Sequence, residues 1–367
     1  MVEWKKLGEI ANITIGEFVH RDKQNPKAKY PVYNGGTTYT GFYESFNNTG
    51  NKIVISARGY AGFVNRVFDN YWAGNSSYSI DVDESIAIWH FVYYYLKNEQ
   101  YNIMSMQQKG GGLAAISKKQ VQELPIPIPS LSEQTRIVEI LDTFTTSIEN
   151  LKQQIAERRK QYEYYRDQLL DLEGKEDNIV SFGDVCEMIK GDGVQKVDFV
   201  DKGIGCIHYG QIYTHYGSFT YTTNKYVSKE VFDKAKKASK GDIIMTDTSE
   251  NVEDICKSVA YLGEDDIAVS NHALIIKHNQ NPKFLSYSTL TRSFFIQKRK
   301  YVVGVKVSGI KPNDLARIKI FLPSIEEQNR IVTILDTFEA SIANLEAQLE
   351  LREKQYGFYR NKLLTFE

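Results

Sequence analysis

The sequence has few cysteines and no long apolar run. Its 367 residues include only three cysteines, all in the second half of the chain, and none forms a CxxC pair. This usage argues against a disulfide framework and fits a reducing cytoplasm. The first 16 residues lack the apolar core of a signal peptide, and the longest apolar stretch, residues 86–96, is too short to span a bilayer.

An excess of one charge and the common catalytic motifs are also missing. The formal net charge is −1, so nucleic-acid binding would need local basic patches. The chain contains none of the motifs GxGxxG, GxxxxGK(S/T), HExxH and GxSxG, and residues 281–284 only distantly resemble the Asn-Pro-Pro-Tyr motif of amino methyltransferases. Cys206, His208 and His215 match no zinc spacing and have no acidic neighbour. We predict neither a catalytic site nor a metal site.

A long internal repeat is present instead. Residues 129–170 recur without a gap as residues 323–364, an offset of 194, and about 25 of the 42 positions are identical. Such a repeat fixes the architecture, here as two halves that each hold a variable domain followed by a long helix. The predicted segments are domains at 1–128 and 177–322 and helical segments at 129–176 and 323–367.

Both copies of the repeat carry helix and coiled-coil signals. Each opens with Pro-Ser-x-x-Glu, the pattern of a capping box. Apolar residues then recur at alternating steps of four and three for more than four heptads, which is typical of a coiled-coil seam. A seam this narrow needs another helix, and the other copy is the best candidate. An antiparallel pair about a pseudo-twofold axis is predicted, because the intervening domain provides the return path.

Arg158 and Arg352 interrupt the seam at the same position of each copy. Their stems could pack while their guanidinium groups reach solvent or a glutamate. Alternatively, a polar seam residue could fix the register or dock a partner helix. The sequence leaves both interpretations open. The candidate coiled-coil or partner-docking residues are Gln134, Arg136, Phe144, Arg158, Gln328, Arg330, Phe338 and Arg352.

The two variable domains resemble each other at their ends and little in between. Strands are predicted at residues 52–56, 63–68, 242–246 and 267–276. The fold class is therefore α+β, with two mixed α/β domains joined by two long helices that pair as an antiparallel coiled coil. A shared frame with different interiors favours two recognition specificities over simple divergence after duplication.

Local charge gives the signal for nucleic-acid binding. Residues 292–311 and the corresponding residues 105–120 carry cations and no acid, beside glycine-rich turns. Such clusters can neutralise phosphates, and nearby amides could read base edges, at Asn75, Gln107, Gln108 and Asn271. The candidate DNA-binding residues are Arg58, Arg66, Lys109, Lys118, Lys119, Arg292, Lys298, Arg299, Lys300, Lys306 and Lys311.

The chain resembles the specificity (S) subunits of type I restriction-modification systems over essentially its whole length. In both copies a strand is followed by Pro-x-(Leu/Ile)-x-Glu-Gln-x-Arg-Ile-Val and a long helix, beginning at residues 126–134 and 320–328. The strand–turn segments at 53–62 and 242–249 also look like that family. The doubled signature is specific, whereas either copy alone would be moderate evidence.

The resemblance implies that each variable domain is a target recognition domain for one half of a split, asymmetric site in double-stranded DNA. The paired helices would act as a spacer and as the dock for two methyltransferase (M) subunits, and restriction (R) subunits would join through the complex. S-adenosylmethionine, ATP and magnesium would bind to those partners, and this chain would be non-catalytic, cytoplasmic and free of membranes. The alternative is a coiled-coil scaffold that presents two protein- or glycan-binding modules.

Overall fold

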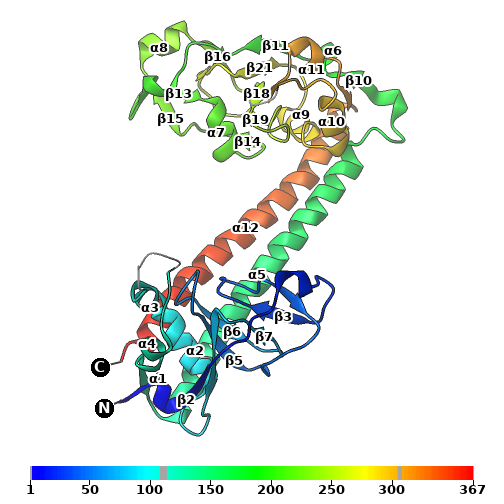
Figure 1. Cartoon of the computed structure of the whole chain (residues 1–367). Helices are drawn as coiled ribbons and strands as arrows, with labels where there is room; N and C mark the ends of the chain where they lie inside the picture. Colours follow the sequence, from blue (N-terminus) through cyan, green and yellow to red (C-terminus); the bar gives the residue numbers. More distant parts are fainter. Residues whose placement is uncertain (1, 108–113, 305–307, 367) are drawn as a thin grey trace. The chain divides into compact units, whose positions relative to one another are not determined.

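The computed structural model describes residues 2–107, 114–304 and 308–366. The chain forms two compact units. Unit 1 comprises Met1–Gln153 and Glu346–Glu367, and unit 2 comprises Gln154–Leu345 (Figure 1). Each unit therefore combines one variable domain with part of each long helix, and both ends of the chain belong to unit 1. The division between the units falls inside the two long helices, so it does not test the boundaries of the four predicted segments, which stay predictions.

The two copies of the repeat form the long helices α5 (Leu131–Leu170) and α12 (Ile325–Leu364). Each begins directly after a serine whose hydroxyl accepts the amide three residues on, at 3.3 Å in both copies. The carboxylates of Glu133 and Glu327, which a capping box would turn back to the serine, instead accept bonds from Arg136 and Arg330. The capping box is thus present only in its serine half.

The helices pair antiparallel, as predicted. In unit 1 the ring of Phe144 on α5 stacks on Tyr359 of α12 with centroids 5.4 Å apart. Further along α5, Lys152 forms a 2.9 Å ion pair with Glu353, which comes earlier in α12. Residue numbers rise on one helix as they fall on the other, so the two helices run in opposite directions.

Unit 2 repeats this packing with the roles of the helices exchanged. The ring of Phe338 on α12 stacks on Tyr165 of α5 at 5.5 Å. The guanidinium of Arg158 lies 6.0 Å from the centre of the Phe338 ring, and that of Arg352 lies 5.6 Å from the Phe144 ring in unit 1. Each seam arginine is half-buried over an aromatic ring of the opposite helix. These contacts favour a role in helix register.

The two domains share a frame of strands and short helices. In the first domain the main sheet has the order β2-β8-β5-β6, and in the second it has the order β11-β21-β17-β19-β14. A terminal ladder, β1 with β9 or β10 with β23, joins the start of each domain to the strand before its long helix. The bounds are β1 Glu3–Lys6, β2 Ala11–Ile15, β5 Lys52–Ser56, β6 Val64–Val67, β8 Ser77–Val82, β9 Pro125–Ile128, β10 Ile179–Ser181, β11 Glu187–Lys190, β14 Phe219–Thr220, β17 Ile243–Thr246, β19 Ser258–Tyr261, β21 Ala273–Lys277 and β23 Lys319–Phe321.

The helices of the frame also correspond. A four-residue helix opens each domain, and three helices follow the main sheet before the long helix begins. Their bounds are α1 Leu7–Ile10, α2 Trp89–Asn98, α3 Gln100–Ser105 and α4 Lys118–Gln122 in the first domain, and α6 Phe182–Val185, α9 Pro282–Ser288, α10 Arg292–Lys298 and α11 Pro312–Leu315 in the second.

The second sheets of the domains differ, as expected from the unlike interiors. The first domain has the order β4-β3-β7, whereas the second has β12-β15-β13-β20-β16 and adds the helices α7 and α8. Their bounds are β3 Tyr30–Tyr33, β4 Gly41–Tyr43, β7 Trp72–Ala73, β12 Phe199–Val200, β13 Ile204–Ile207, α7 Tyr209–Thr214, β15 Lys225–Val227, α8 Lys229–Lys234, β16 Lys236–Ala238 and β20 Ile267–Val269.

The strand predictions are confirmed except for residues 267–276. That segment forms two strands, because His272 takes a left-handed conformation with φ 62° between them. β20 pairs with β13 and β16 in the second sheet, whereas β21 pairs with β11 and β17 in the main sheet. The apolar run therefore continues from one sheet into the other rather than through a single long strand.

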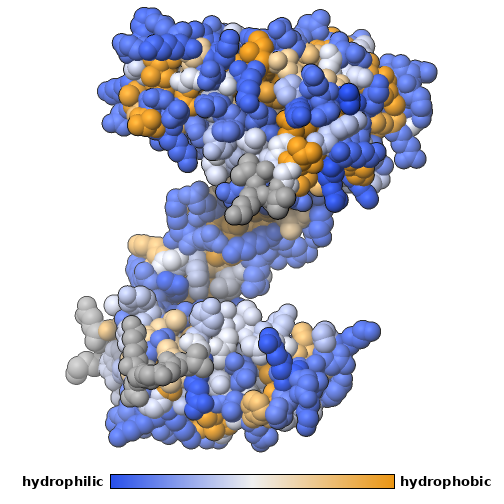
Figure 2. All heavy atoms as spheres, turned by 45° about the horizontal axis from the view of Figure 1, so that its top comes forward, coloured by the Kyte–Doolittle hydropathy of each residue, from blue (hydrophilic) through white to orange (hydrophobic). Residues whose placement is uncertain are grey.

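The last turn of each long helix packs into a domain core. The end of α12 lies in the core of the first domain, and the end of α5 lies in the core of the second. Leu364 of α12 is 2% exposed among the residues of the first domain, and Leu170 of α5 is 2% exposed among those of the second. The face of each unit that is visible in Figure 2 is largely hydrophilic, with hydrophobic residues in separate groups. Among the described residues, no helix is long and apolar enough to cross a membrane.

Candidate nucleic-acid interface

Each domain has the same backbone bridge just beyond its central frame strand. In the first domain Arg58, two residues after β5, pairs with Ala115, and the amide of Ile116 donates to the carbonyl of Ala57 at 3.0 Å. In the second domain the corresponding pair joins β18 (Thr248–Ser249) to β22 (Ser308–Gly309). The bridge thus holds the strand-end loop against the segment that leads into α4 or α11.

The bridge brings three predicted DNA-binding residues of the first domain together. Ala115, the bridge partner of Arg58, lies three residues before Lys118. The hydroxyl of Tyr78 donates to the carbonyl of Ile116 at 3.2 Å, and its pKa is raised by burial while the charge of Arg58 opposes the rise. Arg58, Lys118 and Lys119 are all exposed. This cationic patch can therefore approach a phosphate backbone without prior unfolding.

In the second domain Arg299, Lys300 and Lys311 are exposed cations. Val303 and Gly309, which lie between Lys300 and Lys311 in the sequence, pair through two backbone hydrogen bonds of 3.0 and 2.8 Å. Lys109, Lys306 and Gln108 lie outside the described residues, so their predicted roles stay predictions.

The prediction that Lys298 contacts DNA is wrong. Its side chain is buried, 4% exposed, and its ammonium group donates to the carbonyls of Glu253 at 2.8 Å and Ile255 at 2.5 Å. Burial lowers the pKa of Lys298. The amino group satisfies buried backbone acceptors and is not available to a phosphate.

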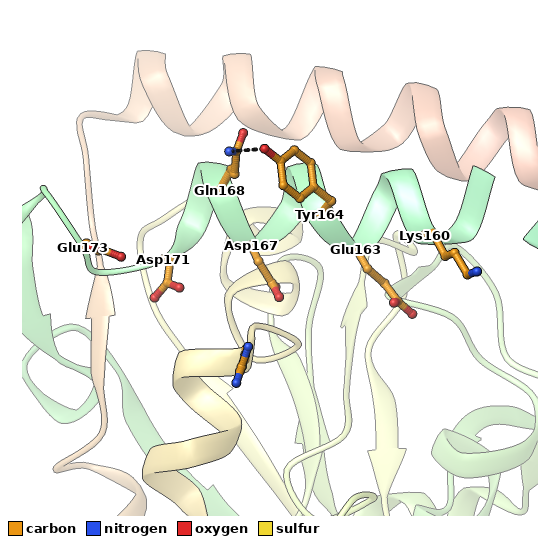
Figure 3. Close-up of a pocket in the computed structure, with 8 residues that line it drawn as sticks. Lys160, Glu163, Tyr164, Asp167, Gln168, Asp171 and Glu173 are labelled. Carbon is orange, nitrogen blue, oxygen red and sulfur yellow. Dashed lines mark hydrogen bonds between the residues drawn. The ribbon is translucent and has the colours of Figure 1, made fainter. Parts of the chain in front are cut away.

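Arg292 is exposed but faces the wrong charge for DNA. It lines a groove of about 670 Å³ in unit 2 together with carboxylates of α5. Glu163 and Asp167 of that helix point the same way as Asp171, which directly follows its last residue (Figure 3). Carboxylates this numerous repel phosphates, so the prediction of a phosphate contact at Arg292 is not supported by its surroundings.

Arg66 also has a structural role that the sequence did not reveal. Its guanidinium lies 5.2 Å from the ring centres of Phe68 and Tyr93 and donates to the Tyr94 hydroxyl at 3.3 Å and to the Asp142 carboxylate at 3.4 Å. The side chain is 19% exposed. These contacts tie the main sheet of the first domain to α5, which corrects the prediction of a DNA contact.

Gln134 and Gln328, predicted as coiled-coil or partner-docking residues, are fully buried and therefore not available to a partner. The side-chain oxygen of Gln134 accepts the amide of Ile88 at 2.8 Å, and its nitrogen donates to the carbonyl of Pro129 at 2.9 Å. Gln328 makes the equivalent pair of bonds in unit 2. Its side-chain oxygen accepts the amide of Asn281 at 3.1 Å, and its nitrogen donates to the carbonyl of Pro323 at 2.9 Å. Each glutamine fastens its domain to the start of its long helix.

The other candidates of the repeat remain accessible or lie in the helix pair. Arg136 and Arg330 are exposed, and each forms a two-point ion pair with the glutamate three residues before it. Phe144 lines a groove of about 370 Å³ in unit 1 with Ile140, Tyr359 and Leu363. A partner could therefore reach Arg136 and this groove.

The structure also places the amide side chains predicted to read base edges and the residue types that could bind a metal. Gln107 is half-buried and donates to the carbonyl of Ala61 at 2.7 Å, so it braces a loop. Asn75 and Asn271 are half-buried and stay predictions. Among the described residues, no group of three His, Cys, Asp or Glu could hold a metal ion. Burial raises the pKa of the Cys206 thiol to about 12.

Sequence reasoning missed one exposed aromatic residue at the cationic patch. Tyr60 is 58% exposed, two residues after Arg58, and its amide donates to the carbonyl of Gly35 at 3.0 Å. The signal was the short Arg-Gly-Tyr run, in which a glycine with φ 72° reverses the chain between two large side chains.

Comparison with known proteins identifies the family. The model for the type I restriction modification DNA specificity domain matches residues 1–158 and 175–352. A protein of Haemophilus influenzae named as a type I restriction enzyme specificity subunit is 29% identical over 100% of this chain and 96% of its own length. A type I restriction enzyme specificity subunit of Escherichia coli is 28% identical over 100% of this chain and 94% of its own.

A solved structure shares the fold. The type I restriction-modification S subunit of M. genitalium aligns with a TM-score of 0.67 at 17% identity, over 100% of this chain and 97% of that one. The chain belongs to the type I restriction-modification DNA specificity family. It is a non-catalytic specificity (S) subunit, and its function is recognition of a DNA target within the restriction-modification complex.

The corrected patches predict different effects of two lysine substitutions. We expect Lys119→Ala to reduce the slope of log affinity against log salt concentration by about 1, because one phosphate contact is lost. Lys298→Met should leave that slope unchanged and lower the free energy of unfolding by about 1–3 kcal/mol, because two buried carbonyls lose their donor. Filter binding at several salt concentrations, with methyltransferase subunits present, measures the slopes. An altered slope for Lys298→Met would contradict the assignment.

Proposed function

We propose that the two domains each read one half of an asymmetric, bipartite site in double-stranded DNA. The observation that carries this proposal is a common strand frame with unlike loops at the same bridge. The first domain carries Arg58 there and the second carries Thr248. Different side chains on one frame favour different bases, so the two half-sites are unlike.

The long helices would act as the spacer between half-sites and as the dock for the partners. The groove beside Arg136 supports a docking role, since its apolar residues recur at the repeat-related positions of unit 2. Those positions are Ile334, Phe338, Tyr165 and Leu169. A duplicated surface fits two M subunits, through which R subunits would join.

Catalysis and its cofactors would belong to those partners. S-adenosylmethionine, ATP and magnesium are proposed to bind the M and R subunits, because the chain carries neither of the phosphate-loop motifs GxGxxG and GxxxxGK(S/T). The cytoplasm stays a prediction from cysteine usage, and all three cysteines are free.

Mapping adenine methylation in cells with and without this chain tests the proposal. We expect a two-part motif with unlike halves that disappears when the chain is removed. A palindromic motif, or a methylation pattern that does not depend on the chain, would contradict it. Binding that is insensitive to salt would instead favour the scaffold alternative, because phosphate contacts release counterions.

A further inference from the structure

We propose that Arg58 is the specificity-determining residue of the first domain and reads a guanine through the major groove. The inference rests on the proposed function, since it names the base that one of the two domains recognises. It depends on three features of the structure: a rigid loop, an unpaired guanidinium and phosphate-binding lysines beside it.

The loop that carries Arg58 is braced on both sides. Within it, the amide of Ser56 donates to the carbonyl of Phe63 at 3.0 Å and the amide of Gly62 donates back to Ser56 at 2.7 Å. The amide of Ala57, directly before Arg58, donates to the carbonyl of Ser76 at 2.7 Å. The backbone at Arg58 is therefore fixed before any DNA binds, which lowers the entropic cost of recognition.

Two glycines let a neighbouring loop interlock with this one. Gly35 and Gly59 have φ angles of 77° and 72°, which other residues rarely adopt. A side chain at Gly35 would place its Cβ 2.6 Å from the carbonyl oxygen of Arg58, and one at Gly59 would lie 2.9 Å from that of Gly35. The close fit of the two backbones leaves Arg58 and Tyr60 projecting from a rigid base.

The guanidinium of Arg58 is exposed and has no hydrogen bond or ion pair within the described part of the chain. Arg66 and Arg136, by contrast, are both paired with carboxylates. A free, planar fork with several donors fits the O6 and N7 acceptors of guanine, which is the commonest specific contact of arginine with DNA.

A phosphate contact is the simpler role for an exposed cation, but two exposed lysines nearby in the chain are also available for it. Lys118 and Lys119 are exposed at the start of α4, three and four residues beyond the bridge partner of Arg58. Contacts to phosphate set the position of a protein on the duplex, and base contacts specify the sequence. Thr248 occupies the corresponding place in the second domain, so the guanine read from this position belongs to the first half-site.

The test uses the chain in complex with its methyltransferase subunits and a pool of double-stranded DNA of random sequence. The pool is bound, recovered and sequenced with the unaltered chain and with R58K, R58A and R21A. Arg21 is a matched control, because it is another exposed arginine of the same domain and lies outside the bridge. R58K keeps the charge and removes the fork.

We expect one guanine of the first half-motif to lose its preference in R58K and R58A, while the second half-motif and R21A remain unchanged. Replacing that guanine with 7-deazaguanine, which lacks the N7 acceptor, should weaken binding by the unaltered chain roughly 10- to 100-fold and leave R58A unaffected. Thermal unfolding of each variant checks that the fold is retained.

The outcomes separate this inference from the proposed function. A motif that is enriched equally by the unaltered chain, R58K and R58A would overturn the role of Arg58 and leave bipartite reading intact. Full affinity of the unaltered chain for the 7-deazaguanine duplex would exclude the contact to N7 and with it the two-point contact of the Arg58 fork. Failure of the unaltered complex to enrich any motif would overturn the proposed function and this inference with it.

Discussion

Replacing Gln134 with leucine should lower the free energy of unfolding of unit 1 by about 2–4 kcal/mol, because a buried donor and a buried acceptor each lose their partner. Leucine fills a similar volume, so the loss of polar bonds dominates over any cavity. Gln328→Leu should have the corresponding effect on unit 2. The repeat thus offers one experiment in two places.

The effect can be assigned to one unit because all three tryptophans, Trp4, Trp72 and Trp89, belong to unit 1. Tryptophan fluorescence during denaturation follows unit 1, and hydrogen exchange of α2 and α9 follows the two units separately. Gln134→Leu should speed exchange in α2, and Gln328→Leu in α9.

Gln168→Leu is the matched control for Gln328→Leu, because both glutamines belong to unit 2, and hydrogen exchange of α9 follows both variants. Gln168 is an exposed glutamine of α5 that bonds the hydroxyl of Tyr164. Its replacement should change the free energy of unfolding by no more than about 0.5 kcal/mol. An equally small effect of Gln134→Leu would show that the buried glutamine does not hold the domain to its helix.

The architecture was predictable because the internal repeat indicates which distant segments of the chain pack together. A heptad seam on two similar segments specifies a helix pair, and the domain between them specifies its direction, so the stacking of Phe144 on Tyr359 follows from the pattern. The strand at 52–56 was visible as a short apolar run between turns. Such patterns are local or periodic, so they can be recognised in the sequence without knowledge of the residues that surround them in the fold.

The candidate site was less predictable because a charged residue reads the same in sequence whether it is exposed or buried. Lys298 and Arg66 were predicted to contact DNA. In the fold, Lys298 donates to backbone carbonyls, whereas Arg66 contacts aromatic rings and Asp142. Arg292 lies across from carboxylates of α5 that are more than a hundred residues away in sequence. Only the fold brings those charges together.

The signature Glu-Gln pair shows the same limit. From the sequence, Gln134 and Gln328 are candidates for coiled-coil or partner-docking contacts, and glutamine is mostly exposed in proteins. The fold places the start of α2 or α9 directly over each glutamine, where its amide bonds two backbone groups. The neighbouring Arg136 and Arg330 point outward, so the signature combines an inner tie with an outer charge.

Asp336→Asn should lower the free energy of unfolding of unit 2 by about 2–4 kcal/mol, because it leaves the Lys283 charge without its partner. The ammonium of Lys283 lies 2.8 Å from the Asp336 carboxylate, and the lysine side chain is only 14% exposed. The ammonium of Lys283 also lies 3.5 Å from the ring centre of Phe219. Asp336 itself accepts the hydroxyl of Tyr287 at 2.7 Å, so this cluster joins α9 to α12.

A double-mutant cycle isolates the ion pair from the other contacts. Lys283→Met should restore part of the stability lost in Asp336→Asn, because the combined variant buries no unpaired charge. The exposed pair of Lys229 and Asp233, with side chains 74% and 54% exposed, provides the control, and Asp233→Asn should change stability by less than about 1 kcal/mol. If Lys283→Met added a further loss to Asp336→Asn, the ion pair would not be what joins the second domain to its helix. The recovery should also appear as slower hydrogen exchange in α9, since that helix carries Lys283 and Tyr287.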